Sequence, residues 1–415
     1  TQFKFAENIT TAEAVVRALE AQAVEHVFIG PPGEHVVELY DALLGSKQIK
    51  GILTTNEYTL SFMADGYSRR TGKVGVFTSV PGPGVTNALT GMAEAALGSI
   101  PIVGIVSDVR SLIDEPFQLH QISHPKLLDS IIKEIFRIRR PEEAADTIFR
   151  AFRTAQAGEP GPVIVEIPCD IYAMTGDVHE PTSGVSAAPE IDHRQIAGIT
   201  QILKQSKKTG IYIGRGAYHA EEEVKKLCEV LQAPVASSIT GRGILAEDHP
   251  LSVGFGFGPN GSKIAKEVFD ECDTVLAVGC KFAEVSTGSY SFKIPKNLIH
   301  ADINPESLNR IFKTPHAIAC DSRIFLQVLL KELQGFAKKE DKRLEQRILQ
   351  GKERFRREIA ESPRLHEAVD PGKFYQKLRA KMGREDALTV DIGNHELWAI
   401  SCFEVFEKGT FLCPT

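Results

Sequence analysis

Short apolar runs rich in β-branched residues alternate with amphipathic stretches of helical length along most of the 415-residue chain. Continuous apolar strands are typical of parallel sheets buried on both faces, and each parallel connection needs a crossover, usually a helix. The pattern therefore predicts doubly wound α/β domains with mostly parallel sheets. In the first block we expect strands at 26–30, 51–55, 74–80, 101–108 and 162–168, and helices at 11–23, 57–70, 84–97 and 141–156.

A second block repeats this alternation. Its expected strands lie at 209–214, 234–239, 274–279, 298–303 and 317–320, and its expected helices at 193–206, 220–232, 262–269 and 321–336. Residues 337–362 are dense in Lys, Arg and Glu, which predicts a solvated helix or a linker. A third block begins at Pro371, which suits a first helical turn, and continues with an expected strand at 387–393, a helix and a final strand.

The Pro-, Ser- and Ala-rich segment that follows the first block predicts a domain boundary near residues 180–190. We therefore expect three domains, at 1–185, 190–340 and 368–415. The last of these is too short to bury a sizeable core alone. We expect the chain to stop inside this domain, as a shortened piece of a longer protein or, alternatively, as a short natural paralogue.

The composition excludes several classes of protein. The net charge of −6 offers no basic surface for nucleic acid. No apolar run approaches the roughly 20 residues that span a bilayer, and the N-terminus lacks the features of a secretory signal. The seven cysteines are scattered without a CxxC pair, which favours free thiols in a reducing compartment. We therefore expect a cytoplasmic enzyme or binding protein.

Chemistry-bearing residues concentrate in the first block. Glu57 opens the helix that follows strand 51–55, and the loops 30–35 (GPPGEH) and 81–87 (PGPGVTN) each follow a strand and open a helix. Glycine lets a backbone approach a ligand closely, and proline restricts the loop. Carboxyl ends of parallel strands meet at one edge of a sheet, where open α/β sheets bind ligands. The segments therefore predict a pocket, although Glu57 alone is also explained by the helix dipole.

These segments carry a resemblance to a known family. GPPGEHVVELYDAL, TTNEYTLSFMADGYSRRTGKVGV, SVPGPGVTNALTGMAEAALGSIPIVGIVSD and GPVIVEIPCDI resemble the pyrimidine-binding domain of thiamine diphosphate enzymes, and above all the acetolactate synthase and 2-oxoacid decarboxylase group. IYIGRGA, PVASSITGRGILAEDHPLSVGFGFGPNG, DTVLAVGC and LIHADINPESL resemble the middle domain, and VDIGNHELWA resembles the start of the diphosphate-binding domain.

The resemblance implies a thiamine diphosphate-dependent carboligase or lyase that makes or breaks C–C bonds of 2-oxoacids, aldehydes or 2-hydroxy ketones through a C2 ylide and an enamine. Glu57 matches the glutamate that hydrogen-bonds N1′ of the aminopyrimidine. The other implied cofactor contacts are Pro32, Gly33, Pro83 and Asn87 at the pyrimidine and, on a weaker match, Asn394 and His395 near the diphosphate. A 2-oxoacid decarboxylase, an acyl-CoA-type lyase and a non-catalytic homologue that binds a nucleotide or a protein are the alternatives.

His35 and Gln118 are the candidates for contact with the substrate. A histidine in the first loop is similar to benzaldehyde lyase and related carboligases, where it relays a proton, and a glutamine at the second position orients a carbonyl. The alternative for His35 is a helix-start residue held by local backbone. His120 and His124 are expected on a surface loop.

Other cofactors and partners follow from the resemblance. Mg²⁺ is implied, but the family's Gly-Asp-Gly motif does not occur, so no metal ligand is named. FAD or ADP in the middle domain stays open, because Lys281-Phe282-Ala283-Glu284 lacks the flavin-binding Arg and Asp residues. Gly256-x-Gly258-x-x-Gly261 is only a nominal dinucleotide motif, and Asp302 suits either a ribose contact or a turn. The family implies a homodimer or homotetramer.

Overall fold

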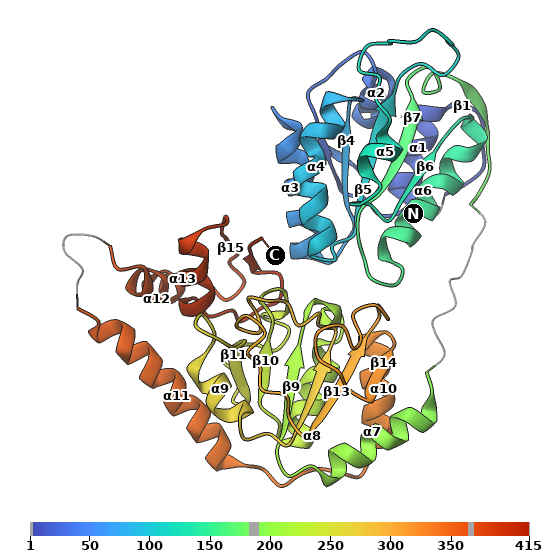
Figure 1. Cartoon of the computed structure of the whole chain (residues 1–415). Coiled ribbons are helices and arrows are strands. Elements are labelled where there is room, and N and C mark those ends of the chain that lie inside the picture. The colour runs from blue at the N-terminus through green and yellow to red at the C-terminus, as the bar shows by residue number, and fades with distance from the viewer. Residues whose placement is uncertain (1–2, 182–190, 364–368, 415) are drawn as a thin grey trace. The chain divides into compact units, whose positions relative to one another are not determined.

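The computed structural model describes residues 3–181, 191–363 and 369–414. The chain forms two compact units, Thr1–Ser186 and Ala187–Thr415 (Figure 1). Each unit is built on its own six-stranded sheet, in which every pair of neighbouring strands is parallel. The predicted α/β class with mostly parallel sheets is therefore confirmed.

The sheet of the first unit has the strand order β3-β2-β4-β5-β7-β6. Its strands are β2 (His26–Ile29), β3 (Lys50–Leu53), β4 (Gly75–Ser79), β5 (Ile102–Asp108), β6 (Glu134–Arg137) and β7 (Val163–Pro168). Helices α1 (Thr11–Ala21), α2 (Val37–Gly45) and α6 (Ala144–Gln156) pack on one face. Helices α3 (Glu57–Thr71), α4 (Pro83–Leu97) and α5 (His124–Leu128) cover the other, so the sheet is buried on both sides.

The strand order reverses between β2 and β4. From β2 the chain moves outward to β3 and then returns to place β4 on the opposite side of β2. The connections after these two strands therefore diverge to opposite faces of the sheet and leave a crevice at its carboxyl edge, where ligands bind in open α/β sheets. The two Gly-Pro loops lie at this edge.

The second unit also has a six-stranded parallel sheet, but with a different connectivity, in the order β11-β10-β9-β12-β13-β14. Its strands are β9 (Thr209–Ile213), β10 (Val235–Ser237), β11 (Ser252–Phe255), β12 (Thr274–Val278), β13 (Asn297–Asp302) and β14 (His316–Ala319). Helices α7 (His193–Gln205), α8 (Glu221–Leu231) and α10 (Ser322–Glu332) pack on one face, and α9 (Lys263–Phe269) packs on the other. The strand order reverses between β9 and β12.

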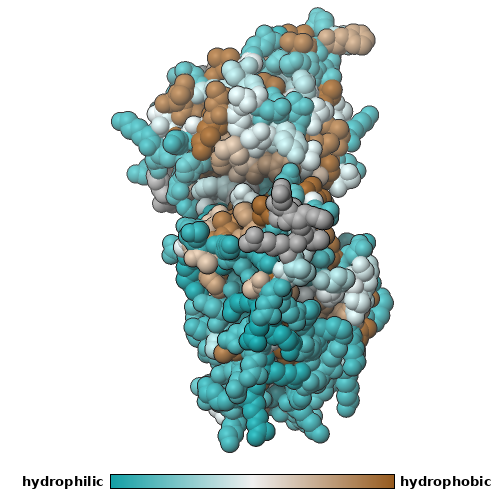
Figure 2. Space-filling view, turned by 90° about the vertical axis from the view of Figure 1, so that its left-hand side faces the viewer, coloured by the Kyte–Doolittle hydropathy of each residue, from teal (hydrophilic) through white to brown (hydrophobic). Residues whose placement is uncertain are grey.

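The charged segment 337–362 contains the helix α11 (Lys342–Glu361), so the helical alternative is the right one. Only a narrow stripe of α11 is buried, including Ile348 and Ile359, and the side of the second unit that carries α11 is strongly hydrophilic (Figure 2). Ile348 belongs to the apolar cluster that contains α9. The helix is therefore solvated on one side and anchored to the sheet layer on the other.

The C-terminal residues form a small layer of α12 (Pro371–Lys381), β15 (Leu388–Thr389), α13 (Asn394–Cys402) and β16 (Phe411–Leu412). Their apolar cluster centres on Tyr375, Ala399 and Phe403 and includes Ile359 of α11. The strand expected at 387–393 is much shorter, because β15 pairs with β16 over only two residues. This layer belongs to the second compact unit. The three-domain division stays a prediction.

Sequence patterns missed several short elements. β1 (Ala6–Thr10) and β8 (Thr175–Val178) form a two-stranded antiparallel sheet, and β6, β11 and α5 were not expected either. Each has only four or five residues, too few for a periodic pattern. The predicted boundary near 180–190 lies, from residue 182 on, outside the described residues. Among the described residues, no helix has the length and apolar character needed to cross a membrane.

Helices α3 and α4 should separate when a methyl group is added between them. A Cβ on Gly91 would lie 2.3 Å from Ser61 Oγ and 2.8 Å from the Phe62 backbone nitrogen. We expect Gly91→Ala to lower the free energy of unfolding by about 1–3 kcal/mol, as overpacking does. Gly66→Ala, in the same helix pair but with nothing within 4 Å, should raise it by up to about 1 kcal/mol. Denaturant unfolding checks both, and similar effects of the two variants would contradict the packing argument.

Candidate functional site

The carboxyl group of Glu57 is held at the carboxyl edge of the first sheet. The connection from β3 is fixed by Thr54, whose hydroxyl donates to the carbonyl oxygens of Ile29 and Asn56 at 3.1 Å each. Asn56 then caps α3, since its side-chain oxygen accepts from the Tyr58 backbone N–H at 2.7 Å. Glu57 is the first residue of α3 and only 8% exposed. Its carboxyl group is therefore buried at a defined place rather than spread over the surface.

Asn87 comes from the next helix along the sheet and meets Glu57. Its Nδ2 donates to Glu57 Oε2 at 3.1 Å, although the two residues lie 30 positions apart. Asn87 itself is exposed, as are Pro83 at the start of α4 and Pro32 in the first loop. The carboxyl edge of the sheet thus carries a buried carboxyl group that is hydrogen-bonded by an exposed amide, together with two exposed proline rings.

Glycines make room for this arrangement. A Cβ on Gly30 would lie 3.2 Å from Glu57 Cγ, and one on Gly33 would lie 3.0 Å from Val80 Cγ1. The hydroxyl of Tyr40 donates to the Gly30 carbonyl oxygen at 3.0 Å. Burial, helped by the nearby Glu57 carboxyl, raises the pKa of Tyr40, so this hydroxyl keeps its proton and its hydrogen bond.

The residues 117–124 close over the second Gly-Pro loop. Gly82 has a φ of +61°, and a Cβ there would lie 2.5 Å from the His120 carbonyl oxygen, so only glycine fits. The His120 ring lies 5.5 Å from the ring of His35, which is 4% exposed. Burial lowers the pKa of His35, so its imidazole is neutral at pH 7 and able to accept a proton.

The loop that follows β5 also contains Gln118, the second candidate for substrate contact, and His120 and His124, which were expected at the surface. The Gln118 side chain is half-buried, and its Nε2 donates to the carbonyl oxygens of Arg110 and Ile113 at 3.0 and 3.4 Å. The expectation of a surface loop is wrong for His124, which is fully buried because its two ring nitrogens have partners in the protein interior. His120 is half-buried.

Sequence reasoning missed Glu166, Arg137 and Tyr40. Glu166 is buried in the middle of β7 and contacts His124, and Arg137 contacts Glu166 from the unexpected strand β6. One signal was present: a glutamate inside the otherwise apolar run PVIVEIP needs a partner, since an ionised carboxylate is almost never buried unpaired.

Asn394 and His395 lie in the second unit, at the first turn of α13, and both are exposed. The preceding Gly393 has a φ of +146°, which favours glycine. The N–H groups at the start of a helix point outward and attract anions. This position is compatible with contact to a diphosphate.

The glycines in the connections after β9, β11 and β12 are explained by packing between loops. A Cβ on Gly214 would lie 2.3 Å from the Gly279 carbonyl oxygen, and one on Gly258 would lie 2.3 Å from Gly288 Cα. Phe282 is buried and stacks on Tyr212, with ring centroids 5.7 Å apart. Asp302 accepts from the Asn304 N–H at 2.9 Å, as expected of a turn-forming residue. The nominal dinucleotide motif therefore has a structural explanation.

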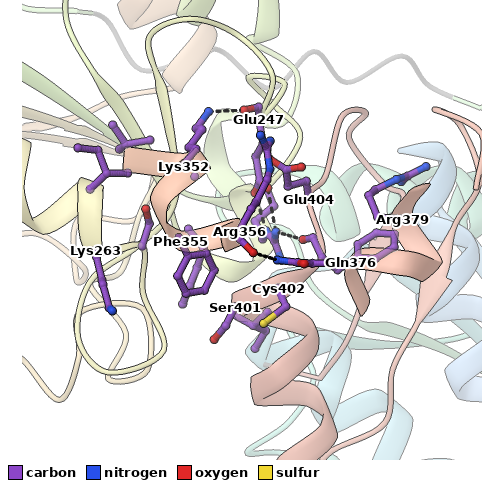
Figure 3. Close-up of a pocket in the computed structure, with 18 of the residues that line it drawn as sticks. Glu247, Lys263, Lys352, Phe355, Arg356, Gln376, Arg379, Ser401, Cys402 and Glu404 are labelled. Carbon is purple, nitrogen blue, oxygen red and sulfur yellow. Dashed lines mark hydrogen bonds and ion pairs between the residues drawn. The ribbon is translucent and has the colours of Figure 1, made fainter. Parts of the chain in front are cut away.

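A pocket of about 390 Å³ lies between β11, α9 and the C-terminal layer of the second unit (Figure 3). It is lined by several cations, but these have partners within the protein. Lys352 Nζ donates to the Glu247 carbonyl oxygen, and Arg356 pairs with Glu404. Arg242 forms two hydrogen bonds with the Glu247 carboxylate, at 2.7 and 2.9 Å. The C-terminal layer is attached to the same loop, because Arg242 also donates to the Phe403 carbonyl oxygen and the Val405 N–H donates to Glu247 Oε2.

Comparisons with known proteins agree with the geometry of the first unit. Residues 9–129 match the family model of the thiamine pyrophosphate enzyme N-terminal TPP binding domain, and residues 196–329 match the thiamine pyrophosphate enzyme central domain. The first match contains Glu57, Asn87 and both Gly-Pro loops.

Full-length relatives give the same result. A probable acetolactate synthase large subunit of Methanocaldococcus jannaschii is 30% identical over 417 residues, covering 97% of this chain and 70% of the relative. One from Methanococcus aeolicus is 31% identical over 97% of this chain and 70% of the relative. The acetolactate synthase isozyme 2 large subunit of Escherichia coli is 31% identical over 94% of this chain and 69% of its own length. The chain therefore belongs to the family of thiamine pyrophosphate enzymes.

Proposed function

We propose that this protein is an acetolactate synthase-like carboligase that uses thiamine diphosphate to form or cleave C–C bonds of 2-oxoacids or 2-hydroxy ketones. The observation that carries the proposal is the buried Glu57 carboxyl group. It is hydrogen-bonded by Asn87 and lies at the strand-order reversal between two Gly-Pro loops. The relatives named as acetolactate synthases support the reaction class.

The residues of the crevice fit the pyrimidine half of thiamine diphosphate. A flat heteroaromatic ring needs a hydrogen-bonding group for its ring nitrogen and a backbone without obstructing side chains. Glu57 supplies the carboxyl group, and Gly30 and Gly33 leave the backbone open where a Cβ would crowd Glu57 and Val80. Pro32 and Pro83, both exposed, supply apolar rim surface.

When bound, thiamine diphosphate supplies the electron sink for the reaction. Glu57 holds a proton at the pyrimidine nitrogen N1′, and Asn87 fixes the orientation of its carboxyl group. His35, neutral at pH 7, accepts a proton from or returns it to a substrate oxygen. Gln118 is proposed to orient the substrate carbonyl, for which it has to exchange its bonds to Arg110 and Ile113.

The diphosphate half is assigned to Asn394 and His395, because they lie at a helix N-terminus that is exposed and preceded by glycine. No residue of the chain is assigned as a ligand of Mg²⁺. Binding of FAD or ADP in the second unit is a separate proposal, which the flavin absorbance of the purified protein tests for FAD and calorimetric titration tests for ADP.

Assembly into a homodimer or homotetramer is also proposed. Large apolar side chains are exposed near the ends of α3 and α4, among them Leu53, Tyr58 and Leu97, which are 50–65% exposed. Apolar patches occur on the side of the first unit where α3 lies (Figure 2). Such patches often mark contacts between proteins. Sedimentation of the purified protein distinguishes monomer, dimer and tetramer.

Replacing Glu57 should abolish activation of the cofactor. We expect Glu57→Gln to slow exchange of the C2 proton of bound thiamine diphosphate by about 10²–10⁴-fold, because general acid–base help of this size is lost. Cofactor affinity should stay within about tenfold, or about 1.4 kcal/mol. Proton exchange followed by NMR, with Mg²⁺ present, measures the rate.

Glu38→Gln is the matched control, since Glu38 also lies in the first turn of a helix of this unit but is exposed. It should leave the exchange rate unchanged. Unchanged exchange in Glu57→Gln would overturn the role of Glu57. A wild-type chain that binds no thiamine diphosphate would overturn the proposed function itself.

Replacing His35 should change the pH profile of turnover. Because burial lowers the pKa of His35, its neutral form persists below the ordinary value of about 6.5, and activity should fall only as the pH drops further. We expect His35→Gln to lower kcat with pyruvate about a hundredfold and to remove this acid limb, while C2 proton exchange stays normal.

His219→Gln is the control, because burial lowers the pKa of His219 as well but the residue lies in the second unit. An acid limb that persists in His35→Gln would contradict the assignment. Product analysis with pyruvate and with benzoin-type ketones separates a carboligase from a decarboxylase or lyase.

A further inference from the structure

A buried histidine supports the turn from which α4 begins. His124 is fully buried, and its Nε2 accepts a hydrogen bond from the Gly82 backbone N–H at 3.2 Å. Its Nδ1 lies 2.8 Å from Glu166 Oε1. Because Nε2 has to be unprotonated to accept, the proton of the neutral ring is on Nδ1, which donates to Glu166. The ring therefore connects a backbone amide to a carboxylate.

Glu166 is in turn held by Arg137. The Arg137 guanidinium donates to Glu166 Oε2 and, at 2.7 Å, to Asp108 Oδ2. Burial alone would raise the pKa of Glu166, but the hydrogen bond from His124 and the charge of Arg137 outweigh it, so that the pKa is lowered. Glu166 is therefore ionised at neutral pH and fixes the tautomer of His124.

The same residues resemble a metal site, but their contacts do not require an ion. Ligand atoms of Asp108, His124 and Glu166 lie within 4.8 Å of one another. The Arg137 guanidinium already bridges the two carboxylates, and His124 Nε2 faces an N–H group. The positive charge that a metal would bring is supplied by the arginine.

Gly82, whose N–H is bound by His124, lies next to the proposed cofactor site. Gly82 caps α4, and its carbonyl oxygen accepts the Thr86 N–H at 3.0 Å. One residue further along the same turn, Asn87 donates to Glu57. The position of Gly82 therefore sets where the first turn of α4 lies and how Asn87 reaches the Glu57 carboxyl group.

We propose that His124 and Glu166 are positioning residues that fix the Gly82 turn and thereby maintain the Asn87–Glu57 hydrogen bond. The proposal rests on the proposed function for its catalytic consequence, but the structural effect exists without cofactor. His124 binds the Gly82 N–H and Glu166, whereas Glu57 is bound by Asn87, so the two residues act on Glu57 through α4.

Amide hydrogen exchange of the cofactor-free chain tests the structural effect. His124→Asn keeps a donor near Glu166 but cannot reach Gly82, whereas His124→Gln places an amide oxygen where Nε2 accepts. We expect exchange of the Gly82 amide to accelerate about tenfold or more in His124→Asn and to stay slow in His124→Gln. The NMR signal of the Asn87 side-chain amide should move toward that of a solvated amide only in His124→Asn.

His120→Asn is the matched control, because it changes a histidine of the same loop whose positive φ of 68° asparagine tolerates. It should leave Gly82 exchange unchanged. If His124→Asn does not fold, Glu166→Gln serves instead, since His124 and Arg137 donate to different oxygens of Glu166 and a glutamine has an oxygen at only one of the two places. A folded variant with unchanged Gly82 exchange and an unchanged Asn87 signal would overturn the proposal.

A double-mutant cycle tests the catalytic consequence. Misplacement of a catalytic group costs up to about a hundredfold in rate, so we expect His124→Asn to slow C2 proton exchange about tenfold to a hundredfold. In turnover assays the KM for pyruvate should change little. In an Asn87→Ala background the same substitution should cost almost nothing, because the two act through one contact. If the rate losses of His124→Asn and Asn87→Ala instead multiply in the double variant, the two residues are not coupled and the proposal is overturned.

The two experiments together separate the positioning role of His124 from the proposed function. Absence of C2 exchange in the wild-type chain would remove the proposed function, while the hydrogen-exchange result would still decide the positioning role. Normal C2 proton exchange in both the wild type and His124→Asn would overturn the catalytic consequence of the positioning role and would leave the proposed function intact.

Discussion

Helices α3 and α4 approach so closely that a methyl group on Gly91 would meet Ser61 Oγ at 2.3 Å. Arg69 of α3 adds an ion pair with Glu94 of α4 at 2.8 Å, and a second with Asp65 at 2.7 Å. Both pairs are largely buried, so removal of one partner would leave an uncompensated charge. The distance between the two helices is thus determined along their length, and the hydrogen bond from Asn87 to Glu57 at their first turns depends on it.

The same edge of the sheet explains why both Gly-Pro loops serve one site. Parallel strands put all their carboxyl ends on one side, and the reversal of order between β2 and β4 opens that side. The residues 117–124, which follow β5, contact both loops, through His35 and through Gly82. The connections after β2, β4 and β5 therefore come together because the sheet places the ends of these three strands side by side.

The second unit shows that a parallel α/β sheet with a reversal of strand order does not by itself imply the same kind of site. Its order also reverses, between β9 and β12, and glycines gather there as well. Those glycines lie against one another rather than around a buried carboxyl group, as the contact of Gly214 with Gly279 shows. The residues at the strand ends, and not the α/β fold, therefore distinguish the two units chemically.

Much of the fold could be predicted from the sequence, because long strands and helices carry their period in the residues themselves. Apolar strands such as 102–108 and amphipathic helices such as 144–156 need no knowledge of their neighbours. The short strands β6 and β11 could not be predicted in this way, since four residues in an edge position depend on the strand they pair with. Because β6 was not predicted, its residue Arg137 was not recognised as a partner of Glu166 either.

The sequence by itself determined the α/β class, the two Gly-Pro loops and the candidate Glu57, because these depend on local pattern and on the edge at which parallel strands end. Only the tertiary structure decided which polar groups meet. His124, expected at the surface, is buried because β7 and β6 bring Glu166 and Arg137 beneath it. A buried ring is stable there only when both nitrogens have partners, and those partners come from strands and turns more than 40 positions away in the chain.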